Sequence, residues 1–190
     1  MTTESQVYRF RIQLDGIAPP IWRTIEVPET YTFWDLHVAV QDAMGWQDYH
    51  LHEFQMRGPR EGGEVIVGLP NDDDWDDRDS KLGWETKIID YFTLDNQTAR
   101  YLYDFGDDWE HTIELEAILP SARAETYPRC VDGSRACPPE DCGGVGGYEE
   151  ICSDGDEELR EYYADFHPDE FDAAEVRFDD PRERWKMAFG

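Results

Sequence analysis

Hydrophobic and polar residues alternate along several stretches of the chain, and each alternation predicts a β-strand with one buried face. Over residues 8–14 the apolar positions are Tyr8, Phe10, Ile12 and Leu14. Over residues 21–27, Ile21, Arg23, Ile25 and Val27 alternate with Trp22, Thr24 and Glu26. Because successive side chains of a strand point to opposite faces, both stretches are typical of half-buried strands. The short loop between them predicts a hairpin.

A change of period after residue 30 predicts a helix. Thr32 and Asp35 form an N-terminal capping signal, and Gly45 is a C-terminal stop. The apolar residues between them lie at helical spacing: Leu36, Val40, Ala43 and Met44. Further strands are predicted over 49–57 and 64–67, and a second hairpin over 100–105 and 110–119 with its turn at 106–108. Residues 87–93 are apolar but of ambiguous type.

The last part of the chain is predicted to be helical, over residues 148–152, 156–166 and 181–189. Strands followed by helices favour an α+β domain, with a mainly antiparallel sheet in an α/β roll. We expect one domain over residues 1–190, with a hairpin–helix N-terminal half and a helical segment over 148–190. The run of aspartates over 71–80 lacks the glycine and glutamate of a calcium loop, so it predicts a mobile acidic loop.

Charge narrows the choice of partners. The chain has 190 residues, and 44 acidic against 17 basic residues give a net charge of −27. This balance indicates adaptation to a high-salt cytosol, where ions screen the repulsion between carboxylates, and the alternative is an ordinary acidic protein. It opposes direct binding to nucleic acid or to an anionic membrane and leaves a protein partner, of unknown kind, as the alternative. The polar start at residues 1–6 does not resemble a signal peptide, so we expect a cytoplasmic protein with reduced thiols.

Candidate metal ligands gather in the segment 130–147, which is rich in glycine and proline. It holds Cys130, Cys137 and Cys142, separated by six and four residues, and Cys152 follows on a predicted helix, where we expect a packed thiol. Two to four residues usually separate paired zinc ligands, so only the second spacing fits a zinc site. Three alternatives stay open for these thiols: zinc ligation, no ligation and a disulfide. Zinc is the one cofactor that the sequence suggests.

Histidines supply a second candidate set. Strand parity puts His50 and His52 on one face, and His111 on the apolar face of the later hairpin. The three imidazoles can form a metal site, or each can be a buried histidine satisfied by hydrogen bonds. His111 can also complete the cysteine site as its fourth ligand. We expect His37 and His167 to be surface or edge groups.

Signals for catalysis are weaker. Asp107, Glu110 and His111 crowd one turn and could support acid–base chemistry, although clusters of this kind arise by chance in so acidic a chain. The glycine-rich run 143–147 lacks a lysine and a preceding strand, so it indicates a connector rather than a phosphate loop.

Four motifs together resemble the plasmid pRiA4b ORF-3-like family. They are Ile21-Trp22-Arg23, Phe33–Trp46 followed by His50-Leu51-His52-Glu53-Phe54, Tyr103–His111, and Cys137–Gly144 followed by Gly147-Tyr148. The resemblance covers most of the chain, from Tyr8 to the last helix. It implies a compact α+β roll and an association with plasmids and insertion elements, and it implies no established activity.

Three functions therefore remain. The first is a non-enzymatic binding or scaffold domain, with a loop-stabilising zinc on Cys130, Cys137, Cys142 and His111. The second is a metal-dependent hydrolase that uses His50, His52 and His111, with Asp107 or Glu110 as base. The third is a DNA-associated accessory of a mobile element. The sequence favours the first.

Overall fold

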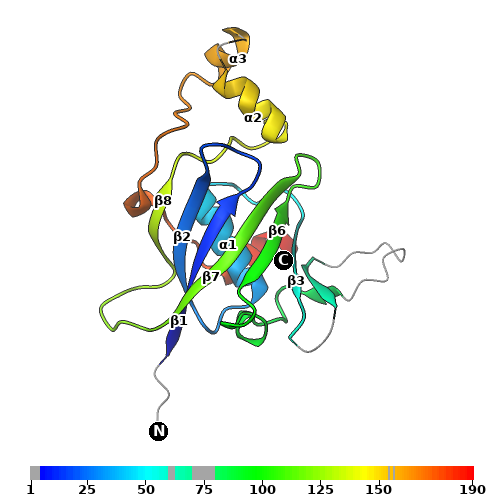
Figure 1. The fold of residues 1–190 in the computed structure, drawn as a ribbon, viewed down its shortest axis with the longest axis vertical. Coiled ribbons are helices and arrows are strands. Elements are labelled where there is room, and N and C mark those ends of the chain that lie inside the picture. The colour runs from blue at the N-terminus through cyan, green and yellow to red at the C-terminus, as the bar shows by residue number, and fades with distance from the viewer. Residues whose placement is uncertain (1–4, 60–62, 70–79, 154, 156) are drawn as a thin grey trace.

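The chain folds around a single curved layer of strands. The structure is a computed structural model that describes residues 5–59, 63–69, 80–153, 155 and 157–190. In this part of the chain, eight strands form one sheet in the order β5-β4-β3-β6-β7-β1-β2-β8 (Figure 1). The strands are β1 (Gln6–Leu14), β2 (Ile21–Pro28), β3 (His52–Arg57), β4 (Glu64–Gly68), β5 (Ser80–Leu82), β6 (Thr98–Tyr103), β7 (Trp109–Pro120) and β8 (Arg129–Ser134). All neighbours pair antiparallel except β4 and β5, which confirms the predicted α+β class.

Among the residues that the structure describes, four α-helices accompany the sheet: α1 (Phe33–Met44), α2 (Gly144–Cys152), α3 (Glu157–Tyr162) and α4 (Pro181–Phe189). Helix α1 lies behind the sheet, and α2 with α3 lies beyond one end of it (Figure 1). None of the helices in the described residues has the length and apolar character needed to cross a bilayer.

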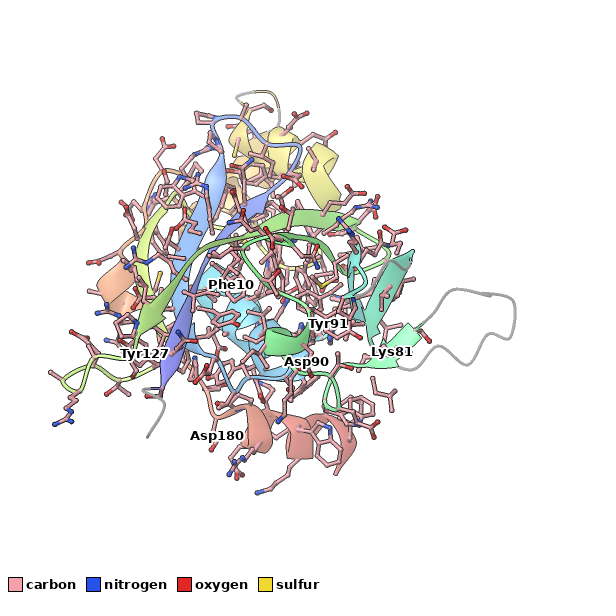
Figure 2. All side chains as sticks on the ribbon, turned by 60° about the horizontal axis from the view of Figure 1, so that its bottom comes forward. Phe10, Lys81, Asp90, Tyr91, Tyr127 and Asp180 are labelled. Atoms are coloured by element: carbon pink, nitrogen blue, oxygen red, sulfur yellow. The ribbon has the colours of Figure 1, made fainter. Side chains whose placement is uncertain are left out.

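The alternation of apolar and polar residues along the strands explains which side chains form the core. The predicted apolar positions of β1 are all buried, and Phe10 pairs with Ile25 of β2 and Leu115 of β7. Phe10 lies near the centre of the molecule over α1, while Lys81 and Tyr127 lie at opposite edges (Figure 2). The first hairpin, the pairing of β3 with β4 and the hairpin of β6 and β7 are confirmed. Burial of the apolar face of the sheet contributes most to the stability of the fold.

Local signals define helix α1 as predicted. The hydroxyl of Thr32 accepts a hydrogen bond from the Asp35 N–H, and the Asp35 carboxylate accepts one from the Thr32 N–H, which completes a capping box. Gly45 ends the helix with φ 94°, a left-handed conformation that glycine adopts without strain.

The C-terminal helix α4 is fastened to α1. The indole N–H of Trp34 donates to the Pro181 carbonyl at 2.9 Å, and Arg184 pairs with Asp42 at 2.7 Å. Because Asp42 is itself nearly buried, this contact holds the last segment of the chain against the domain rather than leaving it free.

Several predicted boundaries were wrong. Cys130 lies in strand β8, which pairs with β2, so the cysteine segment is partly regular structure. Helix α2 begins at Gly144 rather than at residue 148, because tertiary contacts override the low helix propensity of glycine. Helix α3 is shorter than predicted, and residues 87–93 contain a short 3-10 helix at Ile88–Asp90. The predicted acidic loop 71–80 lies outside the described residues, apart from Ser80 in β5.

Candidate functional site

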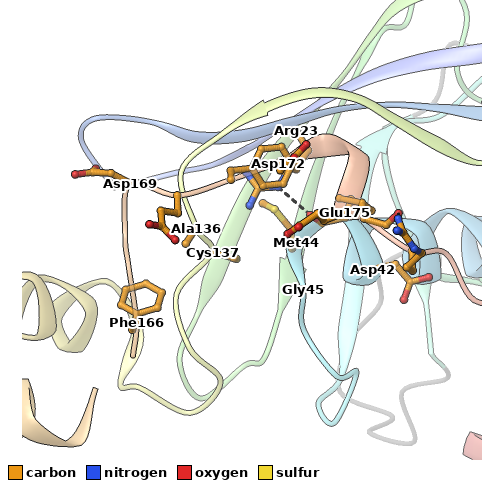
Figure 3. Close-up of a pocket in the computed structure, with 15 residues that line it drawn as sticks. Arg23, Asp42, Met44, Gly45, Ala136, Cys137, Phe166, Asp169, Asp172 and Glu175 are labelled. Atoms are coloured by element: carbon orange, nitrogen blue, oxygen red, sulfur yellow. Dashed lines mark hydrogen bonds between the residues drawn. The ribbon is translucent and has the colours of Figure 1, made fainter. Parts of the chain in front are cut away.

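A groove of about 800 Å³ opens beside β2 and the end of α1. Figure 3 shows Arg23 of β2, Met44 of α1 and Glu175 of the C-terminal segment around this opening. Five carboxylates line the groove: Asp42, Asp169, Glu170, Asp172 and Glu175. The arginines are Arg23 and Arg177, and the apolar part includes Met44, Phe166, Phe171 and Val176. The lining therefore combines an acidic rim with apolar side chains.

Arg23 forms part of the floor, but its charge is not available to a ligand. The residue is 1% exposed, and its guanidinium donates to the carbonyls of Ala43, Trp22 and Ser134 at 2.8, 2.8 and 3.0 Å. The ring of Phe171 covers it, with the ring centroid 3.7 Å from Cζ. Burial lowers the pKa of this guanidinium, and neighbouring Cys137 and Cys130 act in the opposite direction.

The predicted cysteine site is not assembled in the structure. Cys130, Cys137 and Cys142 are free thiols, partly buried against the core. Within the described residues, no three of these thiols and His111 have ligand atoms within 4.8 Å of one another. Zinc ligation by this set stays a prediction, and its geometry would require the loop to rearrange.

Protonation also works against thiol ligation. Burial raises the pKa of the Cys142 thiol to about 12, with the carboxylate of Asp107 adding to the effect. Burial likewise raises the pKa of Cys137 and of Cys130, and in both the Arg23 guanidinium opposes the rise. Because the thiolate is the metal ligand, each thiol would have to lose a tightly held proton first.

In the alternative set, His50, His52 and His111 likewise do not have ligand atoms within 4.8 Å of one another, as far as the described residues show. His50 precedes strand β3, which begins at His52, so strand parity does not apply to the pair. His52 instead stacks on His37 of α1, with ring centroids 3.4 Å apart and planes 8° from parallel. The prediction that His37 is a surface group was wrong, since this residue is fully buried.

A directed chain of hydrogen bonds explains the burial of His37. The Gln41 amide donates to the Tyr101 hydroxyl at 2.9 Å, and this hydroxyl contacts His37 Nδ1 at 2.8 Å. His37 Nε2 lies 2.7 Å from the Asp48 carboxylate, which can only accept. Nε2 therefore carries the proton and Nδ1 accepts one from Tyr101, so the imidazole is satisfied on both sides.

Stacking makes a shared metal ion at His37 and His52 unfavourable. Their ligand atoms and the Asp48 carboxylate lie within 4.8 Å of one another. A nitrogen lone pair lies in the plane of its ring, however, and two nearly parallel rings whose centroids are 3.4 Å apart do not direct their lone pairs at one ion. Burial lowers the pKa of His52 well below its usual range, with His37 adding a smaller effect, so the neutral form of His52 is favoured in this stack.

The candidate acid–base residues point in different directions. His111 lies on the core side of β7 with no exposed surface, and its Nδ1 is 3.1 Å from the Trp109 carbonyl. Glu110 is on the opposite side of the strand and pairs with Arg100. Asp107 accepts a hydrogen bond from the Gly143 N–H at 3.0 Å. The three groups therefore do not face one reaction centre.

One further group of ligand types converges beside these residues. His50, Asp104 and Asp141 have ligand atoms within 4.8 Å of one another. They come from the loop before β3, the turn after β6 and the loop after β8. Sequence reasoning did not select Asp104 or Asp141, although each stands within one of the motifs that carry the resemblance.

The sheet and the helices that accompany it make this chain an α+β domain of mainly antiparallel strands. The model of the family described as "Plasmid pRiA4b ORF-3-like protein" matches residues 6–179, so the chain belongs to that family. The chain is 37% identical over 148 residues to "Uncharacterized protein y4hQ" of Sinorhizobium fredii (strain NBRC 101917 / NGR234), with 78% of this chain and 72% of that protein covered.

A solved structure is similar over nearly the whole chain. It is the crystal structure of the "Protein of Unknown Function MM3350" from Methanosarcina mazei Go1, with a TM-score of 0.85 and 44% sequence identity. The alignment covers 94% of this chain and all of that one. Both relatives are described as uncharacterised or of unknown function, so the comparisons give the family and the fold without a role.

Stability is expected to fall in mild acid because of His111. Burial lowers the pKa of His111 from 6.5 to about 4, so the folded state holds the neutral ring while the unfolded chain binds a proton below pH 6.5. The stabilisation is complete above pH 6.5 and is lost as the pH falls towards 4. From pH 7 to pH 5 this one group should remove about 2 kcal/mol of unfolding free energy.

Urea unfolding at constant KCl measures this effect. The variant His111→Gln should lose about 2 kcal/mol less than the wild type between these two pH values, whatever its stability at pH 7. His167→Gln is the matched control, because His167 is exposed, and it should follow the wild-type profile. Equal pH profiles for all three proteins would contradict the assignment of His111.

Proposed function

We propose that the domain is a non-enzymatic binding module whose acidic groove holds a basic segment of a protein partner. The observation that carries the proposal is the groove of about 800 Å³, with five carboxylates among its lining residues. A cationic side chain entering it would exchange water for several carboxylates, and the apolar patches would pack against its aliphatic stem.

Charges within the groove support a cationic ligand over an anionic one. The Arg23 guanidinium is used by three backbone carbonyls, and the Arg177 guanidinium donates to the carbonyls of Ala174 and Val176. Asp42 and Asp169 are paired with Arg184 and Arg135. Glu170 and Glu175 have no such partner among the described residues, so they are the groups best placed to receive a cation.

A charge-reversed pair of groove residues tests the proposal. The probe is a fluorescein-labelled peptide of nine arginines, and its binding is measured by fluorescence polarisation over a series of KCl concentrations. The variant Glu170→Lys/Glu175→Lys is expected to bind the peptide at least tenfold more weakly than the wild type, because each lysine removes an attraction and adds a repulsion.

A second pair of substitutions, on another surface, is the control for the change in net charge. Glu114→Lys/Glu116→Lys changes the net charge equally, at exposed positions of β7 outside the groove. This pair should weaken binding by no more than about threefold at the same salt, since distant charges are screened. Equal weakening by both pairs would mean that the peptide senses only the overall charge of −27, and the groove proposal would fail.

A further inference from the structure

Two carboxylates and an imidazole face one another at the end of the sheet near the turn after β6. His50 Nε2 lies 2.9 Å from Asp141 Oδ1 and 3.6 Å from Asp104 Oδ2. Ligands bound to one ion by bonds of about 2.1 Å are about 3.0 Å apart at right angles and about 3.4 Å apart at a tetrahedral angle. The distance to Asp141 therefore matches that of neighbouring ligands at a right angle, and the distance to Asp104 is slightly longer than that of a tetrahedral pair.

Hydrogen bonding does not account for this approach. His50 Nε2 is shielded from solvent and, among the described residues, has no hydrogen-bond partner of acceptable geometry despite its short distance to Asp141. Within the same residues, neither Asp104 nor Asp141 pairs with a lysine or an arginine. An unsatisfied nitrogen thus faces two carboxylates that lack a fixed counter-charge, an arrangement that a bound cation would satisfy.

Asp104 is held in place by its own backbone. The residue is 7% exposed and adopts φ 55°, a left-handed conformation that aspartate tolerates better than most residues. Its Oδ1 accepts the Gly106 N–H at 2.9 Å, and its N–H donates to the Leu51 carbonyl at 3.0 Å. These bonds leave Oδ2 directed towards His50, as the supporting contacts of a metal ligand do.

The loop that carries Asp141 is anchored on both sides of it. Before it, the indole N–H of Trp46 donates to the Pro138 carbonyl at 2.9 Å, and the Glu140 carboxylate accepts the Gln47 N–H at 2.7 Å. After it, the Gly143 N–H donates to the Asp107 carboxylate. Asp141 adopts φ 53° between these anchors, and its side chain is 68% exposed. The site is therefore held in position and open to exchange with solvent.

We propose that His50, Asp104 and Asp141 bind a divalent transition-metal ion, Zn²⁺ or Mn²⁺, which fastens the loop after β8 to the end of the sheet. One nitrogen and two carboxylate oxygens suit these ions, whereas Mg²⁺ and Ca²⁺ prefer oxygen ligands alone. Water completes the coordination on the exposed side. This site differs from the one predicted on the cysteines, and it does not depend on the groove.

Isothermal titration calorimetry in 1 M KCl tests the site with Zn²⁺ alone and with Mn²⁺ alone, after chelator treatment of the full chain. His50→Gln and Asp141→Asn are each expected to lower the affinity at least tenfold. His167→Gln is the control, because it removes an exposed imidazole outside the cluster and should bind as the wild type does. Mg²⁺ titrations report the unspecific attraction of the acidic surface, which all four proteins should share.

Cobalt distinguishes the ligand types. Co²⁺ bound to one nitrogen and several oxygens gives weak visible absorption, whereas thiolate ligation adds an intense near-ultraviolet band. Absence of this band in the wild type, together with weaker visible absorption in His50→Gln, is the expected result. An intense thiolate band would assign the ion to the cysteines instead. Either that outcome, or equal affinities in the wild type, His50→Gln and Asp141→Asn, would overturn the proposal.

Discussion

Replacing Arg23 by alanine is expected to lower the free energy of unfolding by about 3–5 kcal/mol, the range found when one partner of a buried charged contact is removed. The guanidinium donates to the carbonyls of Ala43 and Ser134, which join the last turn of α1 to strand β8. Helix α1 has no basic residue in its own last turn, so Arg23 also supplies the positive charge that a helix C-terminus favours. Alanine would leave these carbonyls unpaired beneath the Phe171 ring.

Urea unfolding at a fixed KCl concentration measures the loss of unfolding free energy in Arg23→Ala. Two other variants serve as comparisons. Arg23→Lys keeps the charge but cannot reach separate carbonyls with a planar fork, so it should recover only part of the stability. Arg11→Ala removes the same side chain from the neighbouring strand, where it stacks on Trp22 near solvent, and should cost less than about 1 kcal/mol. A loss for Arg23→Ala no greater than that for Arg11→Ala would show that the buried contacts are not stabilising.

Sequence patterns predicted most of the sheet because its signals are local. Period-two alternation located β1, β2, β6 and β7, and the capping residues located α1. The alternation also placed Arg23 among the inward positions of its strand, next to Ile21 and Ile25. An arginine at an inward position of a strand indicates a buried polar contact. This signal could have been used to predict that the side chain is buried and hydrogen-bonded. Two of its three acceptors lie 20 and 111 residues away, so they could not be predicted.

The candidate sites depended on contacts distant in sequence. His50 and Asp141 are brought together by the turn after β6 and by hydrogen bonds that anchor the Asp141 loop to Trp46 and Gln47, which lie in the same segment as His50. Spacing along the chain says nothing about such anchors. The cysteines were selected because they are close in sequence, yet Cys130 is fixed in an edge strand by its pairing with Ile25. Proximity in sequence therefore did not bring three of these ligand atoms within 4.8 Å of one another in the part of the chain that the structure describes.

Gly147→Ala is expected to lower the free energy of unfolding by about 2–4 kcal/mol, as do substitutions that clash with a fixed backbone. A Cβ atom at Gly147 would lie 1.8 Å from the Cys142 carbonyl oxygen, so the loop or the helix would have to shift. The same loop carries Asp141 and is held at Gly143 by the Asp107 carboxylate. If the ion binds as proposed, the shift should also weaken Zn²⁺ binding, which calorimetry on the variant would detect.

The neighbouring Gly146 provides the matched control. A Cβ atom there would meet nothing within 4 Å, and the residue lies within helix α2. Gly146→Ala should therefore raise the unfolding free energy by up to about 1 kcal/mol, because alanine is the better helix former. The two substitutions make the same chemical change one residue apart and are expected to have opposite signs. The same sign for both would mean that α2 does not rest on the Cys142 carbonyl, and the anchored position of the Asp141 loop would then need another cause.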